Sequence, residues 1–355
     1  MASGSRKGSI IIHSTSSNEL EYRADNVFAG SVNGLCYLLN GSLVACGWDD
    51  GGHLKVFSPS LELVQTLVEN QFSVLRVTVS STGLIASGDG CGRVMIWSES
   101  GEGGEWARVQ VLEDHRNYIN EVGFSPDGKL LATGSWRSIK VYSFNEGSAI
   151  LAHTLEGHTN DTNSLSFSPD CKLLCSGSAD KSIKFWNPAD GSLVKTIDEA
   201  HTPYVLSVSY SPNGRVLVSA GYDRRMKIFD AETFELKHTF EQEFRTMQVT
   251  ITADSNFIVS ANDDKTVRIT SCREFWVTCL NDILNLVLHI VYKWEFVLFL
   301  EPNEDTSRIE EVMRRLGECV HDGGYNVTSE ILSFLSPTHL PVQITPTRWK
   351  SKARN

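Results

Sequence analysis

Short runs of hydrophobic residues alternate with polar turns between residues 28 and 270, and the same succession of runs recurs along this stretch. The six copies end at residues 57, 97, 142, 186, 229 and 270, so consecutive ends are 40, 45, 44, 43 and 41 residues apart. In the fourth copy, the apolar run Leu173–Cys175 precedes small residues and Asp180, and the alternating run Ile183–Trp186 follows. This pattern predicts a buried strand, a tight turn and a second strand. A period of this length is typical of a four-stranded sheet unit.

A second turn signal lies about twenty residues upstream of each run end. The sequences are SLSFSPD at 164–170, EVGFSPDG at 121–128 and SVSYSPNG at 207–214. Proline fixes φ in such turns, and Asp, Asn or Gly tolerates the bend that follows. Strands joined by tight turns predict an antiparallel sheet in each unit rather than a helical repeat.

With these residues the chain resembles the WD-repeat (WD40) family. The residues that carry the resemblance are Gly157–His158, Phe167–Asp170, Gly177–Asp180 and Ile183–Trp186, and it extends over about residues 28–270. The resemblance implies an all-β fold, a β-propeller of six clear WD repeats. It also implies an irregular seventh blade closed by the N-terminal strand. The fold leaves function open, because propellers serve many roles.

The expected organisation has three parts. Residues 1–8 are expected to be a flexible N-terminus, and residues 9–300 the propeller, with clear repeats over 28–270 and the irregular seventh blade over 271–300. Residues 301–355 are expected to form a helical and then disordered tail. The apolar stretch 275–300 allows three interpretations: two strands of the seventh blade, a membrane or membrane-surface helix, or a segment foreign to the fold.

Histidine, serine and aspartate recur in register with the repeat and invite comparison with a catalytic triad. A triad occurs once in a protein, whereas a structural set recurs with the repeat, so we expect no catalytic residues. The resemblance implies that the His of each set bonds the Asp of the tight turn and that Ser and Trp extend the network. The fourth repeat has the whole set, and the fifth has all but the Trp; the residues are His158, Ser176, Asp180, Trp186, His201, Ser219 and Asp223.

The other repeats depart from this set. The third keeps His115 and Thr133, but its turn is one residue shorter and lacks the Asp. The second has Cys91 at the Asp position, and the sixth has Gln242 for His. We therefore expect the fourth blade to be the stiffest, and the second and third blades the loosest.

Two aligned positions in each repeat indicate where partners bind. The residue just before the inner strand is Ser31, Ser73, Tyr118, Asp161, Tyr204 or Arg245, and the residue before the turn Asp is Asp49, Ala179, Tyr222 or Asp263, with Trp136 in the shortened turn. Tyr, Trp and Arg are the side chains most used as binding hot spots. The predicted partner-binding patch is Tyr118, Trp136, Tyr204, Tyr222 and Arg245.

Composition narrows the function. A net charge of −11 argues against direct nucleic-acid binding, because phosphate contacts require a dense basic surface. The eight Cys form no CxxC pair, so reduced core thiols are expected, with no metal and no cofactor. The N-terminus has no apolar run typical of a signal peptide, which favours a cytoplasmic, and also allows a nuclear, location.

The leading hypothesis is therefore a non-enzymatic scaffold or adaptor that binds other proteins or peptides and assembles a multiprotein complex. Two alternatives remain open at this point. One is a membrane-associated trafficking or coat component that uses 275–300, and the other is a scaffold of an RNA-processing complex.

Overall fold

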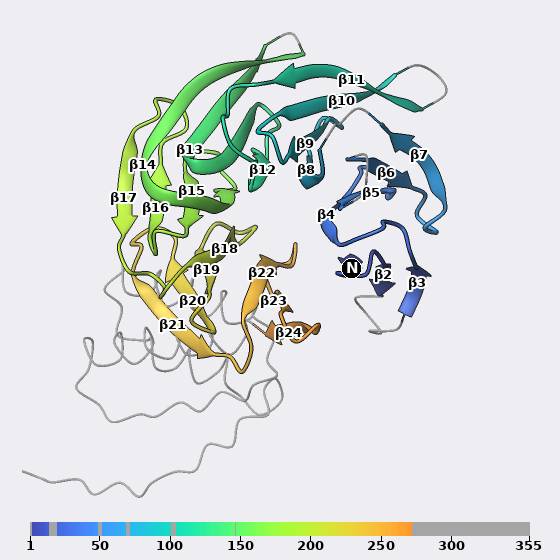
Figure 1. Ribbon diagram of the computed structural model, residues 1–355. Coiled ribbons are helices and arrows are strands. Elements are labelled where there is room, and N and C mark those ends of the chain that lie inside the picture. The colour runs from blue at the N-terminus through green and yellow to red at the C-terminus, as the bar shows by residue number, and fades with distance from the viewer. Residues whose placement is uncertain are drawn as a thin grey trace, which may run out of the picture. The chain divides into compact units, whose positions relative to one another are not determined.

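The computed structural model describes residues 2–271 except 14–19, 49–51, 69–71, 101–103 and 146. These residues form six β-sheets in a propeller arrangement, with no helix among them (Figure 1). The all-β fold predicted from the repeats is confirmed. The expectations for 272–300 and 301–355 lie outside the described residues.

Three repeats form four-stranded antiparallel sheets whose strands follow chain order from the centre outwards. Blade 1 comprises β4 (Val32–Tyr37), β5 (Leu43–Gly47), β6 (Leu54–Phe57) and β7 (Leu63–Leu67). Blade 2 comprises β8 (Val74–Val79), β9 (Ile85–Asp89), β10 (Val94–Ser100) and β11 (Glu105–Leu112). Blade 5 comprises β18 (Val205–Tyr210), β19 (Val216–Gly221), β20 (Arg225–Asp230) and β21 (Leu236–Glu241).

Two further repeats share one six-stranded sheet. Its strands are β12 (Glu121–Phe124), β13 (Leu130–Asn145), β14 (Ser148–Phe167), β15 (Leu174–Ser178), β16 (Ile183–Trp186) and β17 (Leu193–Ile197). Blade 3 consists of β12, β13 and the part of β14 that pairs with β13 up to Glu156. Blade 4 consists of β14 from Thr162 onwards with β15, β16 and β17.

The long strand β13 folds back on itself within blade 3. The amide of Phe144 donates to the Lys129 carbonyl at 3.1 Å, and the Thr133 hydroxyl lies 3.5 Å from the Lys140 carbonyl. The fold-back occurs at Trp136 and Arg137, and Arg137 has a φ of 59°. The turn that is one residue short is thus a tight hairpin, which stands in place of the longer Asp-containing turn.

Blade 6 is described with three strands: β22 (Thr246–Ile251), β23 (Phe257–Asn262) and β24 (Val267–Ser271). The exposed fractions of Val267 and Ile269 in β24 are 40% and 48%, whereas Ile183 and Phe185, at the same positions of blade 4, are fully buried. The blade 4 residues pack against the inner strand of blade 5. No such strand follows blade 6 among the described residues, which explains the difference.

The N-terminus forms a sheet of its own, whose first strand lies within residues 1–8, the segment expected to be flexible. Strand β1 (Ala2–Gly4) pairs with β2 (Ile10–His13), which pairs with β3 (Leu20–Ala24).

This sheet repeats the second, third and fourth strands of a blade. Ala2–Gly4 corresponds to Cys175–Gly177. A Cβ on Gly4 would lie 2.5 Å from a Val32 methyl carbon, and one on Gly177 would lie 2.6 Å from a Val205 methyl carbon. Each glycine therefore allows the first residue of the next inner strand to approach closely.

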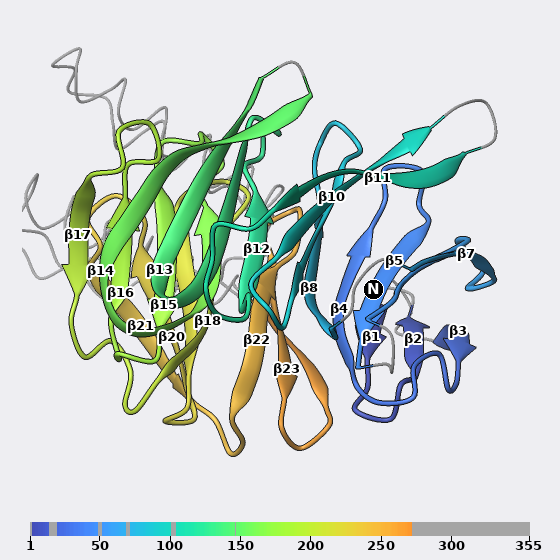
Figure 2. The same ribbon diagram turned by 45° about the horizontal axis from the view of Figure 1, so that its top comes forward.

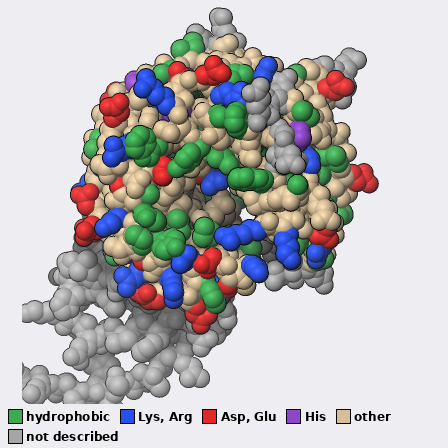
Figure 3. Space-filling model, viewed as in Figure 1, with side chains coloured by type: hydrophobic (Ala, Val, Ile, Leu, Met, Phe, Trp, Pro, Cys, Tyr) green, Lys and Arg blue, Asp and Glu red, His purple; other side chains and the backbone are tan. Residues whose placement is uncertain are grey.

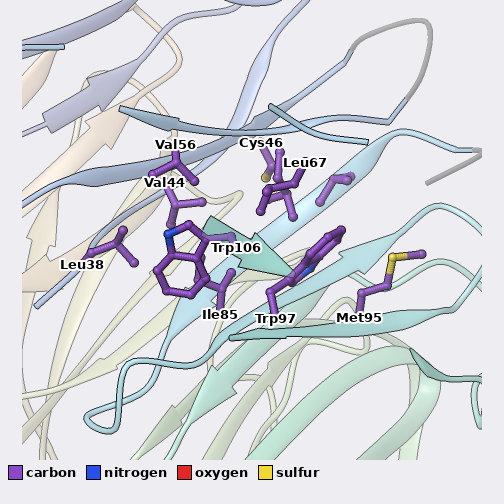
Figure 4. Close-up of a cluster of buried hydrophobic side chains, with 11 residues drawn as sticks. Leu38, Val44, Cys46, Val56, Leu67, Ile85, Met95, Trp97 and Trp106 are labelled. Carbon is purple, nitrogen blue, oxygen red and sulfur yellow. The ribbon is translucent and has the colours of Figure 1, made fainter. Parts of the chain in front are cut away.

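The core lies between neighbouring sheets, which stand side by side in Figure 2. Figure 4 shows one such layer, where Val44 and Val56 of blade 1 meet Ile85 and Trp97 of blade 2. All four are almost completely buried.

Side-chain amides tie the outer strands of neighbouring blades. Gln65 donates to the Trp106 carbonyl at 3.0 Å and accepts from the Trp106 amide at 2.9 Å. Gln110 bonds both backbone groups of Ala149 in the same way, at 2.8 Å each. Each glutamine thus takes the hydrogen-bonding role of a strand residue between the outer strands of two neighbouring sheets.

Candidate functional site

The most complete polar network of the described residues lies inside blade 4. The two ring nitrogens of His158 lie 2.7 Å from Asp180 Oδ2 and 2.7 Å from Ser176 Oγ. The indole nitrogen of Trp186 donates to the same Ser176 Oγ at 2.8 Å. Burial acts to raise the pKa of Asp180, but hydrogen bonds from His158 and Ser182 outweigh it and hold that pKa below its usual range.

The burial of this arrangement favours a structural role over a catalytic one. The exposed fraction of Ser176 is 0%, so a substrate cannot reach its hydroxyl without the blade opening. The network recurs in blade 5, where His201 lies 2.9 Å from Asp223 and 2.7 Å from the hydroxyl of Ser219, which is also fully buried. Paired buried polar groups stabilise a blade without offering a reactive atom at the surface.

Blade 3 keeps part of the network and replaces the rest. His115 Nε2 lies 2.7 Å from Thr133 Oγ1, and Tyr142 takes the Trp position and donates to Asp114 at 3.1 Å.

Blade 2 uses a different solution. The buried Asp89 accepts from the amides of Cys91 and Arg93 at 2.9 Å each and from Arg93 Nε at 2.9 Å. The sequence predicts a loose turn here, because Cys91 stands at the usual Asp position. The structure shows the turn held instead by an Asp two residues earlier.

The connections that carry the predicted partner-binding positions lie at the same end of each blade. Successive strands of a blade run in opposite directions. The connection that enters the inner strand therefore lies at the same end of the blade as the turn between the second and third strands. A recurring backbone hydrogen bond joins the two connections within a blade. Its donors and acceptors are Trp48 to Ser31, Gly90 to Ser73, Ala179 to Asp161, Tyr222 to Tyr204, and Asp263 to Arg245.

Three of the predicted patch residues form one contact cluster. The rings of Tyr204 and Tyr222 meet edge to face with centroids 5.7 Å apart. The Arg245 guanidinium carbon, from blade 6, lies 3.8 Å from the Tyr222 ring centroid. Arg245 Nε lies 3.8 Å from Asp263 Oδ2, which holds the guanidinium over the ring. Both tyrosines remain partly exposed, at 40% and 36%.

The other two predicted residues meet at Asp161. The Tyr118 hydroxyl lies 3.1 Å from both carboxylate oxygens of Asp161, and Trp136 is the cross-strand partner of Asp161. Burial and the Asp161 carboxylate raise the pKa of Tyr118, so its hydroxyl stays a donor at neutral pH. The exposed fractions of Tyr118 and Trp136 are 40% and 48%.

Three further aromatic residues lie at this end of the blades and are not part of the patch predicted from the sequence. They are Trp48, Phe72 and Phe244, all exposed. Trp48 occupies the turn position of blade 1, because its amide makes the recurring bond. The longer first turn hides this register. Phe72 and Phe244 lie one residue before the aligned position, so an alignment column misses them although their aromatic character is visible in the sequence.

Arginines stack on several of these rings. Arg93 lies over Phe72 at 5.8 Å and Arg268 over Phe244 at 5.6 Å, measured from the guanidinium carbon to the ring centroid. Figure 3 shows one face of the ring, on which hydrophobic and Lys or Arg side chains surround a central hollow.

The sequence comparison agrees with this geometry. The sequence model of the family described as "WD domain, G-beta repeat" matches residues 106–143, 150–187 and 191–230. This chain carries WD repeats. The matched repeats are the third, fourth and fifth, the three that keep the buried histidine. A search of curated proteins finds no match to the chain. WD-repeat propellers generally serve as protein-interaction domains and typically have no enzymatic activity.

Across the described part of the chain, no group of His, Cys, Asp and Glu is placed to hold a metal ion. Within that part there is also no helix long and apolar enough to cross a membrane. The stretch 275–300, on which the membrane alternative depends, lies outside it.

Proposed function

We propose that this WD-repeat protein is a non-enzymatic scaffold that binds other proteins through the end of the blades carrying Tyr118, Trp136, Tyr204, Tyr222 and Arg245. These residues come from blades 3, 5 and 6, so one partner surface would bridge several repeats. Assembly of a multiprotein complex follows from a platform of this width.

The proposal rests on where the exposed aromatic side chains lie. Nine aromatic side chains are exposed among the described residues, and seven of them lie in the connections at this end of the blades: Trp48, Phe72, Tyr118, Trp136, Tyr204, Tyr222 and Phe244. Aromatic side chains cost free energy when they are left in water and dominate interface hot spots. Their concentration at one end favours a binding face over an ordinary solvated surface.

Affinity capture with the full chain tests the proposal. Wild-type protein, Tyr204→Ala/Tyr222→Ala and Tyr37→Ala are immobilised, and the captured proteins are quantified by mass spectrometry. Tyr37 is a matched control, because its exposed fraction is 44% and it ends an inner strand at the opposite end of blade 1.

We expect the double variant to lose the captured set, while Tyr37→Ala keeps it and both variants remain folded at the temperature of the capture, as checked by circular dichroism. Retention of the whole set by the double variant would disprove the proposal, as would equal loss in the Tyr37 control.

A further inference from the structure

The two halves of the patch occupy the same repeat positions but differ in charge. In blades 5 and 6, Tyr204 precedes the inner strand, Tyr222 lies in the turn, and the next blade contributes Arg245. In blades 3 and 4, the corresponding residues are Tyr118, Trp136 and Asp161. A carboxylate therefore stands in the second half where a guanidinium stands in the first.

The first half shows how a guanidinium is held on this surface. Arg245 lies 3.8 Å from the ring centroid of Tyr222 and 3.8 Å from a carboxylate oxygen of Asp263. The cation has a ring and an anion as partners, and both come from the protein itself. This half needs no external charge.

The second half has the rings and the anion, but its own cation, Arg137, lies over the Trp136 ring and makes no ion pair with Asp161. Asp161 accepts from the Tyr118 hydroxyl and makes no ion pair among the described residues. The neighbouring Arg137 is engaged elsewhere. Its Nε donates to the Thr159 carbonyl at 2.6 Å, and its guanidinium carbon lies 4.9 Å from the Trp136 ring centroid.

We propose that the surface of Tyr118, Trp136 and Asp161 binds an arginine side chain of a partner protein. A guanidinium is planar, pairs with a carboxylate through two donors and stacks on aromatic rings, which suits this set better than an ammonium does. The net charge of −11 adds a field that attracts a basic segment. This inference rests on the proposed function and specifies the partner's chemistry at one half of the same face.

Three short peptides that differ at one position test the proposal. In each peptide, Gly, Ser and Leu flank one central residue. This residue is arginine in the first peptide, citrulline (a neutral isostere of arginine) in the second, and glutamate in the third. Each peptide is titrated into the full chain, and the shifts of the Trp136 indole and the Tyr118 amide are followed by NMR. The variants are Asp161→Asn and, as the matched control, Asp263→Asn.

The arginine peptide is expected to give saturable shifts at Tyr118 and Trp136, with affinity about tenfold weaker for citrulline and for Asp161→Asn. Asp263→Asn should leave these shifts unchanged, and the glutamate peptide should not produce them. Equal binding of citrulline, stronger binding of glutamate, or no saturable shift would overturn the inference.

The failure of this inference can be told apart from failure of the platform itself. If capture still depends on Tyr204 and Tyr222 while the arginine peptide leaves Trp136 unperturbed, the scaffold stands and the arginine site does not. If capture is also unaffected in Tyr204→Ala/Tyr222→Ala, the proposed face fails as a whole.

Discussion

Arg245 and Tyr222 belong to different blades, yet the guanidinium carbon of Arg245 lies 3.8 Å from the centroid of the Tyr222 ring. The contact joins the turn of blade 5 to the connection that enters blade 6. It therefore contributes both to the shape of the proposed binding face and to the cohesion of two repeats.

The energy of this contact can be measured by a double-mutant cycle with Tyr222→Ala and Arg245→Ala. A partly exposed cation–π pair contributes about 0.5–1 kcal/mol. The double variant should therefore lose less free energy of unfolding than the sum of the losses in the two single variants, and the difference should equal this contribution. Urea unfolding of the four proteins gives the coupling. The pair Tyr118→Ala and Arg245→Ala is the control, since these side chains serve different clusters and should be additive.

Ser176→Ala should destabilise the protein by about 2–4 kcal/mol. The change removes the oxygen that serves both His158 Nε2 and Trp186 Nε1, and it leaves two buried polar atoms without a partner. Chemical denaturation measures the effect. Ser81→Ala, on the exposed surface of blade 2, is the matched change and should stay within about 0.5 kcal/mol of wild type. A cost below that of the Ser81 control would show that the network contributes nothing to stability.

Stability should fall as pH decreases from about 6.5 to 4. Burial lowers the pKa of His115 from 6.5 to about 4, so in this window the unfolded chain binds a proton that the folded chain does not. The contribution is fully present above the unfolded pKa and is lost by about pH 4. Burial lowers the pKa of His201 as well, which acts in the same direction.

Urea midpoints measured across this range check the pH prediction, with His115→Gln as the diagnostic variant. Removal of the titrating group should flatten the pH dependence by up to about 3 kcal/mol, the value that corresponds to the shift. An unchanged slope in His115→Gln would assign the effect to other groups.

Asp89→Ala should cost about 3 kcal/mol in blade 2, a loss comparable to the Ser176 change in blade 4. Asp89 is 1% exposed, and it bonds two backbone amides as well as the Arg93 side chain. Its removal leaves Arg93 half-buried without its anion. Cys91→Ser, two residues away and exposed, serves as the control and should be nearly neutral. Hydrogen exchange of β9 and β10 should report the same loss locally.

The sequence was sufficient for the repeats and for the buried network. A hydrophobic pattern with a constant period predicts identical packing units, and the His, Ser and Asp of blades 4 and 5 pair as the family resemblance implies. Exposure of Tyr118, Trp136, Tyr204 and Tyr222 also followed from alignment, because repeat position determines which end of a blade a residue occupies.

The failures occurred where the length of a connection changes. The extra residues after Gly47 shift the register, so Trp48 takes the aligned place. In the sequence, the shortened turn at Trp136 and Arg137 is only recognised as lacking the Asp. In the structure, it is a tight hairpin. At the N-terminus only Ile10–His13 carries a strand pattern, and Ala2–Gly4 is too short to be recognised without its neighbours β2 and Val32.

The polar residues that hold the turns differ from blade to blade, and this difference has an evolutionary consequence. Blade 2 closes its turn with Asp89 and Arg93, whereas blade 4 uses His158 and Asp180. The side-chain hydrogen bonds of each set join residues of one blade, and the turns contact the next blade through backbone bonds such as that from the Ile119 amide to the Asp89 carbonyl. A single repeat can therefore drift in sequence at its turn without disturbing the ring. Since the proposed binding face consists of these same turns, substitutions in one repeat can change the side chains that it presents while the rest of the ring stays the same.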